Sequence, residues 1–397
     1  MNTPFKRAMA KASELTRSGK LQEATAMIRA LLQDPTAVPP RSDVMPGALP
    51  HGANDFIDGE FTRLEPETEA KAPKKKPVRA KSAASPLAET LRKIAAGGMP
   101  VRGPLSGDPA TAPQGAQFLS LAHTGAQGSR SFRLYIPAKR STTPMPLIVM
   151  LHGCTQTPED FALGTGMNAV AEENGCLIAY PAQPSGANAQ KCWNWYRPED
   201  QARDRGEPAL IAGLTQQILR EHPADPDRVY VAGLSAGGAA AVVVAAAYPD
   251  LFSAVGVHSG LPAGGATDIA SAFAAMRSGS QSKPHRNVVP TIVFHGLADS
   301  TVHPQNGAAI LAQALHPMSG LRVAERTGTS DGGRSYRSAV HLHPDGRSMA
   351  EHWQIEGAGH AWAGGNPAGS YTDASGPDAS REMARFFLQH RPGSRRA

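Results

Sequence analysis

The most constraining feature of this sequence is the run from Gly233 to Gly238, which reads Gly-Leu-Ser-Ala-Gly-Gly. Residues 228–232 before it have the composition of a buried strand, and the Ala/Val-rich residues 239–247 after it predict a helix. A sharp turn from strand to helix needs small residues around its centre, because its backbone is strained and closely packed. The run therefore predicts a strand–turn–helix unit with Ser235 at the N-terminus of the helix, although such a pattern also occurs in plain tight turns.

Strand and helix patterns alternate from about residue 116 onward. We expect strands at residues 117–121, 131–136, 146–151, 176–180, 228–232, 254–258, 291–295 and 352–356. A closing amphipathic helix is expected at residues 380–388. Strands separated by helical segments imply a mainly parallel sheet with helices on both faces, entered here through an antiparallel pair. The fold class predicted for residues 116–397 is therefore α/β.

The first 115 residues differ from the rest. Residues 1–35 predict a helical hairpin, because apolar side chains recur at helical spacing on both sides of a Ser-Gly break. Residues 36–115 are rich in Pro, Ala, Gly, Ser and Lys, and they predict a disordered linker because little in them can form a core. The hairpin has three possible partners: the α/β domain, a second subunit, or another surface.

Charge and hydropathy limit the classes of surface or molecule to which this chain is expected to bind. The formal net charge is +6, and six Lys or Arg residues lie between Lys71 and Lys81 of the expected linker. Such a run favours an anionic amphiphilic surface, with a solvated tether as the alternative. No aromatic interleaving accompanies it, so nucleic acid is not expected. No apolar stretch is long enough for a transmembrane segment, and residues 1–33 contain no signal-like run, which predicts a cytoplasmic protein.

A nucleophilic serine needs a base, and the base needs an acid that orients it. Asp299 follows the expected strand at 291–295, and His360 follows the last strand in a Gly-rich loop. The order Ser235, Asp299, His360 is that of the α/β-hydrolase fold, which we therefore predict. The alternatives are a turn role for Asp299 and a structural role for His360. The less suitably placed rivals are Asp331, His303, His341, His343 and His352.

An oxyanion hole should combine two backbone amides near the nucleophile. We expect the amide of Ala236, which follows Ser235, and that of Cys154, on the loop after the strand at 146–151. Cys154 could instead be a thiol nucleophile, but no base is placed for it. Cys154 and Cys192 both flank elements expected around the site, so we predict that they lie close enough for a bridge, with Cys176 buried in a strand. In a reducing compartment the pair would remain thiols.

Several motifs together resemble the poly(3-hydroxybutyrate) depolymerase-type esterases, a family that also contains feruloyl and acetylxylan esterases. The resemblance extends from about residue 130 to about residue 390. The matching runs are LHGCTQ at 151–156, CWNW at 192–195, GLSAGG at 233–238, HGLAD at 295–299 and GAGHAW at 357–362. The resemblance implies the same triad, the Cys154 amide in the oxyanion hole, and Trp193 and Trp195 along the substrate crevice. The alternative for the two tryptophans is that they cap the core.

These observations together predict a serine carboxylic-ester hydrolase that acts on hydroxyalkanoate esters, oligomers or polyester through an acyl-enzyme. No cofactor and no metal are expected. A feruloyl or acetylxylan esterase is the alternative with the same chemistry. The alternative of another class is a granule-associated binding protein with little turnover, held on the granule by the hairpin and the basic linker. Because many members of the family are secreted, an extracellular location is the alternative to the cytoplasm.

Overall fold

The structure is a computed structural model that describes residues 113–139, 141–281 and 289–391. The expected hairpin at residues 1–35 and nearly all of the expected linker at residues 36–115 lie outside the described residues, so those boundaries remain predictions. Among the helices that the structure describes, none combines the length and the apolar character needed to cross a membrane.

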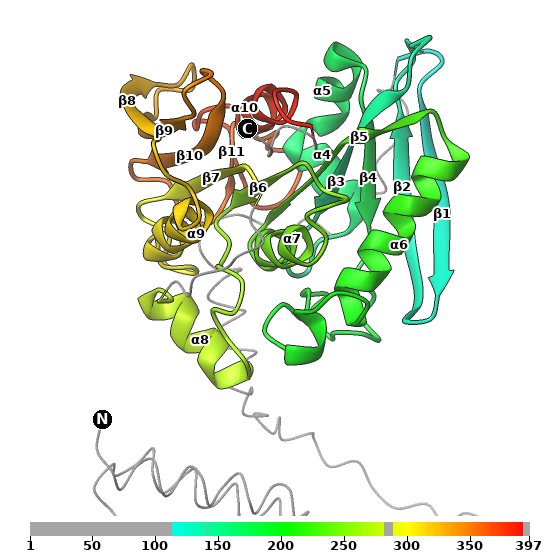
Figure 1. Ribbon diagram of the computed structural model, residues 1–397, viewed down its shortest axis with the longest axis horizontal. Helices are drawn as coiled ribbons and strands as arrows, with labels where there is room; N and C mark the ends of the chain where they lie inside the picture. The colour runs from blue at the N-terminus through cyan, green and yellow to red at the C-terminus, as the bar shows by residue number, and fades with distance from the viewer. Residues whose placement is uncertain (1–112, 140, 282–288, 392–397) are drawn as a thin grey trace, which may run out of the picture. The chain divides into compact units, whose positions relative to one another are not determined.

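A ten-stranded mixed sheet forms the centre of the described part, in the order β1-β2-β4-β3-β5-β6-β7-β10-β9-β8 (Figure 1). The strands from β4 to β10 in this order pair in parallel, whereas β1, β2, β9 and β8 pair antiparallel at the two sides. The strands are β1 Gln117–Gly125, β2 Gly128–Ile136, β3 Met145–Leu151, β4 Leu177–Pro181, β5 Ala224–Leu234, β6 Ala254–His258, β7 Thr291–Gly296, β8 Arg322–Thr329, β9 Ser335–Leu342 and β10 Ser348–Ile355, with a small separate pair of β11 Trp362–Ala363 and β12 Thr372–Asp373.

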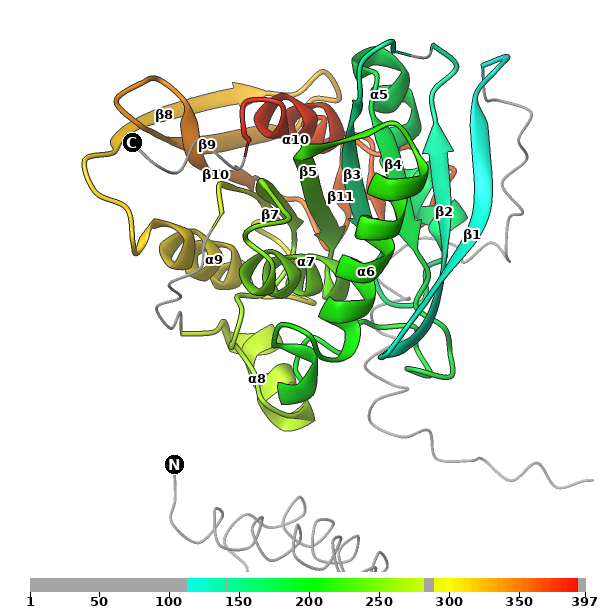
Figure 2. The same ribbon diagram turned by 45° about the vertical axis from the view of Figure 1, so that its right-hand side comes forward.

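Helices cover both faces of the sheet, as the sequence predicts. Helices α6, α7 and α9 lie on one side, and α5 and α10 lie on the other (Figures 1 and 2). Strand β3 shows why: Leu147, Val149 and Leu151 point into one apolar cluster, and the alternating Ile148 and Met150 point into the other. The helices are α4 Pro158–Thr165, α5 Met167–Asn174, α6 Gly206–Glu221, α7 Ala236–Ala247, α8 Ile269–Ser278, α9 Gln305–Leu315 and α10 Ala379–Phe387, with a short 3₁₀ turn at Pro198–Asp200.

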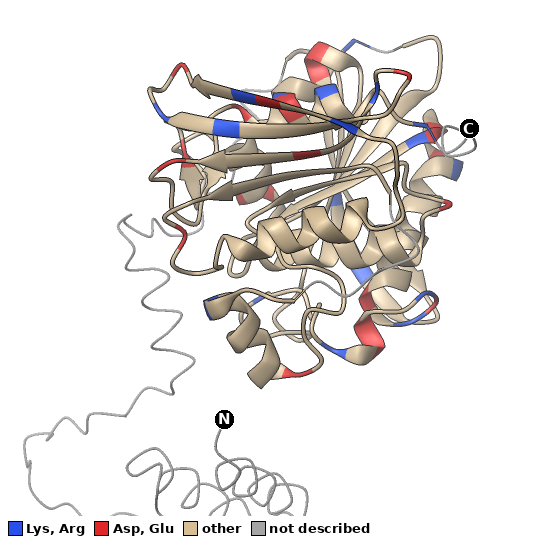
Figure 3. Cartoon of the chain, turned by 60° about the vertical axis from the view of Figure 1, so that its left-hand side comes forward, with Lys and Arg blue, Asp and Glu red and all other residues tan. Residues whose placement is uncertain are grey.

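The hairpin of β8 and β9 is not among the predicted strands. Most residues of β8 are exposed, and it carries Arg322, Glu325 and Arg326 where a buried strand would carry apolar residues. Figure 3 shows charged positions of both signs on these outer strands. Because β8 is the edge of the sheet, its charges oppose pairing with a further strand.

The turn at residues 343–347 joins β9 to β10 and is closed by its own contacts. Asp345 lies 2.6 Å from Arg347 and 3.0 Å from His343, and residues 344–346 are exposed. This turn precedes β10 and therefore lies at the amino end of that strand. Because β10 runs parallel to β7, the amino ends of both strands lie at the same edge of the sheet. The loops that follow β7 and β10 lie at the opposite end of the sheet, and they carry Asp299 and His360.

Candidate active site

Ser235 occupies the turn between β5 and α7, as predicted, in a backbone conformation that few non-glycine residues adopt. Its φ is 59° and its ψ is −120°. The turn is held from two sides: the Ser235 N–H donates to the carbonyl of His258 at 2.9 Å, and the Ser235 carbonyl accepts from Ala239 at 2.9 Å. Strain of this kind persists only where the surroundings fix it, and it often marks a functional position.

Gly233 and Gly237 allow the strained turn to pack tightly. A Cβ atom at Gly237 would overlap the carbonyl oxygen of Leu151, and one at Gly233 would overlap the backbone of Gly237. In the sheet, Leu151 is also the register partner of Gly233. The loop that follows β3 therefore begins in direct contact with the Ser235 turn.

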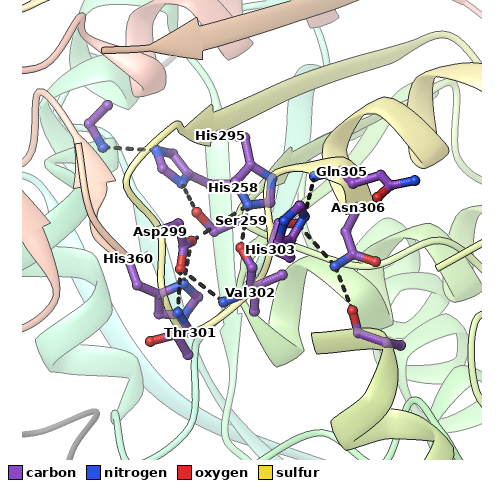
Figure 4. A network of polar contacts seen from close by, with 12 residues as sticks. His258, Ser259, His295, Asp299, Thr301, Val302, His303, Gln305, Asn306 and His360 are labelled. Carbon is purple, nitrogen blue, oxygen red and sulfur yellow. Dashed lines mark hydrogen bonds and ion pairs between the residues drawn. The ribbon is translucent and has the colours of Figure 1, made fainter. Parts of the chain in front are cut away.

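Asp299 and His360 meet at the carboxyl ends of the adjacent parallel strands β7 and β10. The Nδ1 atom of His360 lies 2.7 Å from Oδ2 of Asp299, in the network drawn in Figure 4. The other carboxylate oxygen accepts the N–H groups of Thr301 at 2.9 Å and Val302 at 2.8 Å. The rival Asp331 instead lies in the exposed turn between β8 and β9.

The environment of Asp299 fixes both its charge and the tautomer of His360. Burial alone would raise the pKa of the Asp299 carboxyl. The nearby imidazoles of His360 and His295 and the hydrogen bonds from His360 and Val302 outweigh it and lower this pKa to about 2. An ionised carboxylate only accepts, so the His360 proton is on Nδ1, and Nε2 keeps a lone pair available to take a proton.

One amide stands out in the loop after β3. The Gly153 N–H donates to the Gln156 side chain at 2.9 Å, the Thr155 N–H to the Gln190 carbonyl at 2.7 Å, and the Gln156 N–H to the Gly153 carbonyl at 3.4 Å. Within the part of the chain that the structure describes, the Cys154 N–H has no hydrogen-bond acceptor. Ala236 begins α7, where N–H groups have no partner inside the helix. Neither predicted oxyanion donor therefore has a backbone acceptor among the described residues.

The tryptophans expected along the crevice are buried in the structure. Trp193 is 0% exposed and Trp195 is 6% exposed, and both belong to the core cluster on the α6 and α7 side. The indole N–H of Trp193 donates to the carbonyl of His152 at 3.0 Å, so its side chain supports the loop that carries Cys154. Trp193 has no solvent-exposed surface in the described structure, because all of it is used in packing, and its contact with substrate stays a prediction. The core-capping alternative fits the burial of both residues.

A buried carboxylate holds the segment that contains these tryptophans. Glu207, at the start of α6, accepts the backbone N–H of Asn194 at 2.7 Å and its side-chain amide at 2.8 Å. Glu207 also accepts from the side chain of Gln183, whose own backbone N–H donates to His152 at 3.1 Å. Burial, and then the nearby Asp200, raise the pKa of Glu207. The segment around Trp193 and the loop around His152 are thereby joined by polar contacts.

Cys154 and Cys192 form a disulfide, with Cα atoms 4.2 Å apart. The prediction that they lie within bridging distance is therefore confirmed. Cys176 is a free thiol, fully buried just before β4, and burial raises its pKa to about 12. The residue that offers the free amide is thus covalently tied to the segment that Glu207 holds.

Two residues near these loops were not singled out by the sequence patterns. His258 ends β6 and contacts both the Ser235 turn and the loop after His360. Tyr371 has a positive φ of 53°, its carbonyl accepts from Trp362 at 2.7 Å, and its hydroxyl lies 3.2 Å from that of Thr155. The short apolar run of β6 marks His258 only as the end of a buried strand. A positive φ at an aromatic residue such as Tyr371 leaves no signal in a single sequence.

Comparison with known proteins places this geometry in a family. The family model described as esterase PHB depolymerase matches residues 130–335, which include Ser235 and Asp299. The chain belongs to this esterase family. His360 lies beyond the matched residues, so its assignment to the candidate site rests on the contact with Asp299.

Relatives of this esterase include enzymes named for different substrates. Poly(3-hydroxyalkanoate) depolymerase C of Paucimonas lemoignei is 34% identical over 229 residues, which are 54% of each chain. Feruloyl esterase B of Thermothelomyces thermophilus is 32% identical over 45% of this chain and 67% of that one. The chain thus spans about half the length of the Paucimonas depolymerase.

A solved structure of an acetyl xylan esterase from Aspergillus awamori matches 69% of this chain and 99% of that one, with a TM-score of 0.54 and 19% identity. At this identity the match concerns the fold alone. The described part of this family member has the α/β-hydrolase fold that its sequence predicts.

Proposed function

We propose that this chain is a serine carboxylic-ester hydrolase in which Ser235 is the nucleophile, His360 the general base and Asp299 the residue that orients His360. The observation that carries the proposal is the 2.7 Å contact between Asp299 and His360. It occurs at the carboxyl ends of parallel strands, the same edge of the sheet at which β5 leads into the strained Ser235 turn.

The reaction follows from these positions. The Ser235 hydroxyl oxygen attacks the ester carbonyl while Nε2 of His360 takes its proton. The charge that develops on the carbonyl oxygen is stabilised by the amides of Cys154 and Ala236. His360 returns the proton to the departing alcohol and leaves an acyl-enzyme at Ser235. Water, deprotonated by the same nitrogen, then releases the acid and restores the hydroxyl.

Hydroxyalkanoate esters, their oligomers or the polyester are the substrates that we propose first. The name of the Paucimonas relative supports this class. An apolar side chain also lies close to the site: Leu297 is 38% exposed and stands two residues before Asp299. A feruloyl or acetylxylan ester is the second candidate, supported by the names of the relatives with those activities. Initial rates on hydroxybutyrate oligomers, methyl ferulate, acetylated xylan and p-nitrophenyl esters separate the two.

The Ser235→Ala variant tests the reaction itself. We expect it to lose about 10⁴-fold or more in turnover while its thermal unfolding stays close to that of the wild type, because only the nucleophile is removed. Ser185→Ala, at an exposed serine, is the control and should keep wild-type rates. If Ser235→Ala keeps more than about a tenth of the activity, Ser235 is not the nucleophile.

Binding to a storage granule is a separate proposal, and it concerns the expected hairpin and the expected basic linker, which lie outside the described residues. It rests on the sequence pattern of residues 1–115 and on the depolymerase relatives. A chain that begins near residue 116 should keep its rate on soluble esters but lose sedimentation with granules, and raised salt should mimic that loss. If Ser235→Ala keeps the biological phenotype of the wild type, a binding role is more important than turnover.

A further inference from the structure

His258 joins two segments that the proposed reaction must hold in register. Its backbone carbonyl accepts the Ser235 N–H at 2.9 Å. On its side chain, Nε2 accepts the N–H of Ala363 at 3.0 Å, and Ala363 lies three residues after His360. Figure 4 shows His258 beside His295 and Asp299 in the same polar network. One residue therefore contacts both the nucleophile turn and the segment that follows the base.

The hydrogen bonds of His258 define its protonation. A backbone N–H can only donate, so Nε2 of His258 must be the acceptor, and its proton is on Nδ1, 3.2 Å from the Ser259 hydroxyl. The residue is 0% exposed. Burial, and then His295 and His360, lower its pKa to about 3. The imidazole therefore stays neutral near pH 7, with both ring nitrogens engaged.

The imidazole ring of His258 also contacts aromatic rings from two of these segments. It stacks on Phe294 of β7, with ring centres 5.9 Å apart and planes at 12°. The same ring also stacks on Trp362, in the segment after His360, at 5.3 Å and 28°. Strand β7 leads directly to Asp299. His258 thus touches each of the three segments that carry Ser235, Asp299 and His360.

Asp299 fixes the tautomer and tilt of His360, but a single hydrogen bond at Nδ1 does not fix the distance from the imidazole to the Ser235 turn. We propose, on the basis of the function proposed above, that His258 is a positioning residue that sets this distance through the hydrogen bond from Ala363 to its Nε2 atom. The hydrogen bond anchors the segment after His360 to the strand end that also anchors Ser235. His258 itself does not contact the reacting atoms.

Two variants of similar volume separate this role from simple packing. His258→Gln loses the ring but keeps an acceptor that reaches the position of Nε2, whereas His258→Leu loses the ring and the acceptor. His352→Leu is the matched control, because His352 is also buried, at 7% exposure on β10. Its Nε2 has no hydrogen-bond partner among the described residues. If His258→Leu does not fold, His258→Asn replaces it, since the shorter amide reaches the position of Nδ1 but not that of Nε2.

We expect His258→Leu to lower kcat on a p-nitrophenyl ester by about 100-fold with KM changed less than about threefold, because misplacement by about an ångström affects the transition state most. His258→Gln should stay within about tenfold of the wild type, and His352→Leu should match it. Thermal unfolding of all variants shows whether a change in stability explains the rates. Equal kcat losses in His258→Gln and His258→Leu, or no loss in either, would overturn the proposal.

A spectroscopic measurement keeps the inference distinct from the proposed function. The low-field ¹H NMR signal of the His360 Nδ1 proton, bonded to Asp299, requires no turnover. We expect this signal to shift or broaden in His258→Leu and to remain in His258→Gln and His352→Leu. If the wild type hydrolyses no ester, the proposed function fails while this measurement still tests the positioning. If the wild type is active and the signal is the same in all variants, the positioning role fails alone.

Discussion

The two oxygens of the Asp299 carboxylate have different partners. One accepts two backbone N–H groups of its own loop, and the other accepts the His360 imidazole. The first oxygen fixes where the carboxylate lies, and the second uses that position to orient a side chain from another strand. A neutral amide in the same place could keep part of the first arrangement but not the charge that defines the second.

We therefore expect Asp299→Asn to lower kcat by about 10⁴-fold, because the amide favours the wrong His360 tautomer. The control is Asp331→Asn, at an exposed turn position between β8 and β9. Steady-state kinetics on a p-nitrophenyl ester measure both variants. A severe loss in Asp331→Asn with near-normal activity in Asp299→Asn would show that the acid has been misassigned.

The lowered pKa of Asp299 also predicts how stability depends on pH. Its pKa is about 2 in the folded protein against an ordinary 3.8, so its ionised form stabilises the fold above pH 4, and this contribution disappears as the pH falls toward 2. We expect the free energy of unfolding of the wild type, relative to Asp299→Asn, to shrink by about 2 kcal/mol between pH 5 and pH 2. Urea unfolding measures this difference. A difference that grows on acidification would contradict the pKa.

Sequence patterns point to Asp299 because it follows the apolar run of β7, and to His360 because it follows the last expected strand in a Gly-rich loop. They do not reveal the role of His258, because its side-chain partner is the backbone N–H of Ala363, 105 residues further along the chain. Every residue except proline has a backbone N–H group, so the residue type does not show which of these groups will bind a given side chain. The contact is created only when β6 and the segment after β10 come together in the folded sheet.

At the scale of single elements, the turn between β5 and α7 has no room for side chains at Gly233 and Gly237. Gly237 lies against the carbonyl of Leu151, which is backbone and cannot move aside as a flexible side chain could. The helix that follows is almost entirely Ala and Val, so it packs closely on the sheet and holds the turn in place. These small residues made the unit predictable from sequence.

Gly237→Ala should therefore damage the fold of the turn more than a typical glycine substitution. We expect loss of esterase activity and a clear drop in melting temperature, because the added methyl group would overlap Leu151. Gly186→Ala is the control, since a Cβ atom there meets nothing within 4 Å and the residue is exposed. Wild-type activity and melting temperature in Gly237→Ala would show that the turn is looser than described.

The strands of the β8–β9 hairpin could not be predicted from the hydrophobic pattern of the sequence. Strand prediction relies on apolar or alternating residues, and β8 has neither, because both of its faces are largely exposed. Its position is set by pairing with β9, which in turn pairs with β10. Such a strand is specified by its neighbours and not by its own composition.

For the whole molecule, the disulfide between Cys154 and Cys192 adds a covalent link to a domain otherwise held by its two apolar clusters. The link closes 38 residues of chain that include α4, α5 and β4. Such a link stabilises the fold mainly by reducing the conformational entropy of the unfolded chain. It also keeps the Cys154 amide beside the segment around Trp193.

Reduction of this bridge should lower the free energy of unfolding by about 3–4 kcal/mol, from the length of the closed loop. Chemical unfolding with and without reductant measures the change, and the reductant should have no further effect on Cys192→Ser. Thiol titration of the unfolded protein should find only Cys176 without reductant and all three cysteines with it. Three free thiols in the untreated protein would contradict the bridge.

The closed turn at residues 343–347 lies at the edge of the sheet opposite the candidate active site, and it offers a position for covalent attachment. β10 has eight residues between this turn and the His360 loop, which at about 3.3 Å per residue separates them by about 25 Å. A single cysteine or peptide tag grafted at the exposed residues 344–346 would fasten the enzyme to a bead or fibre with its reactive edge facing away from the support. An immobilised hydrolase oriented in this way could still meet a solid film, a substrate that cannot diffuse to a hidden site.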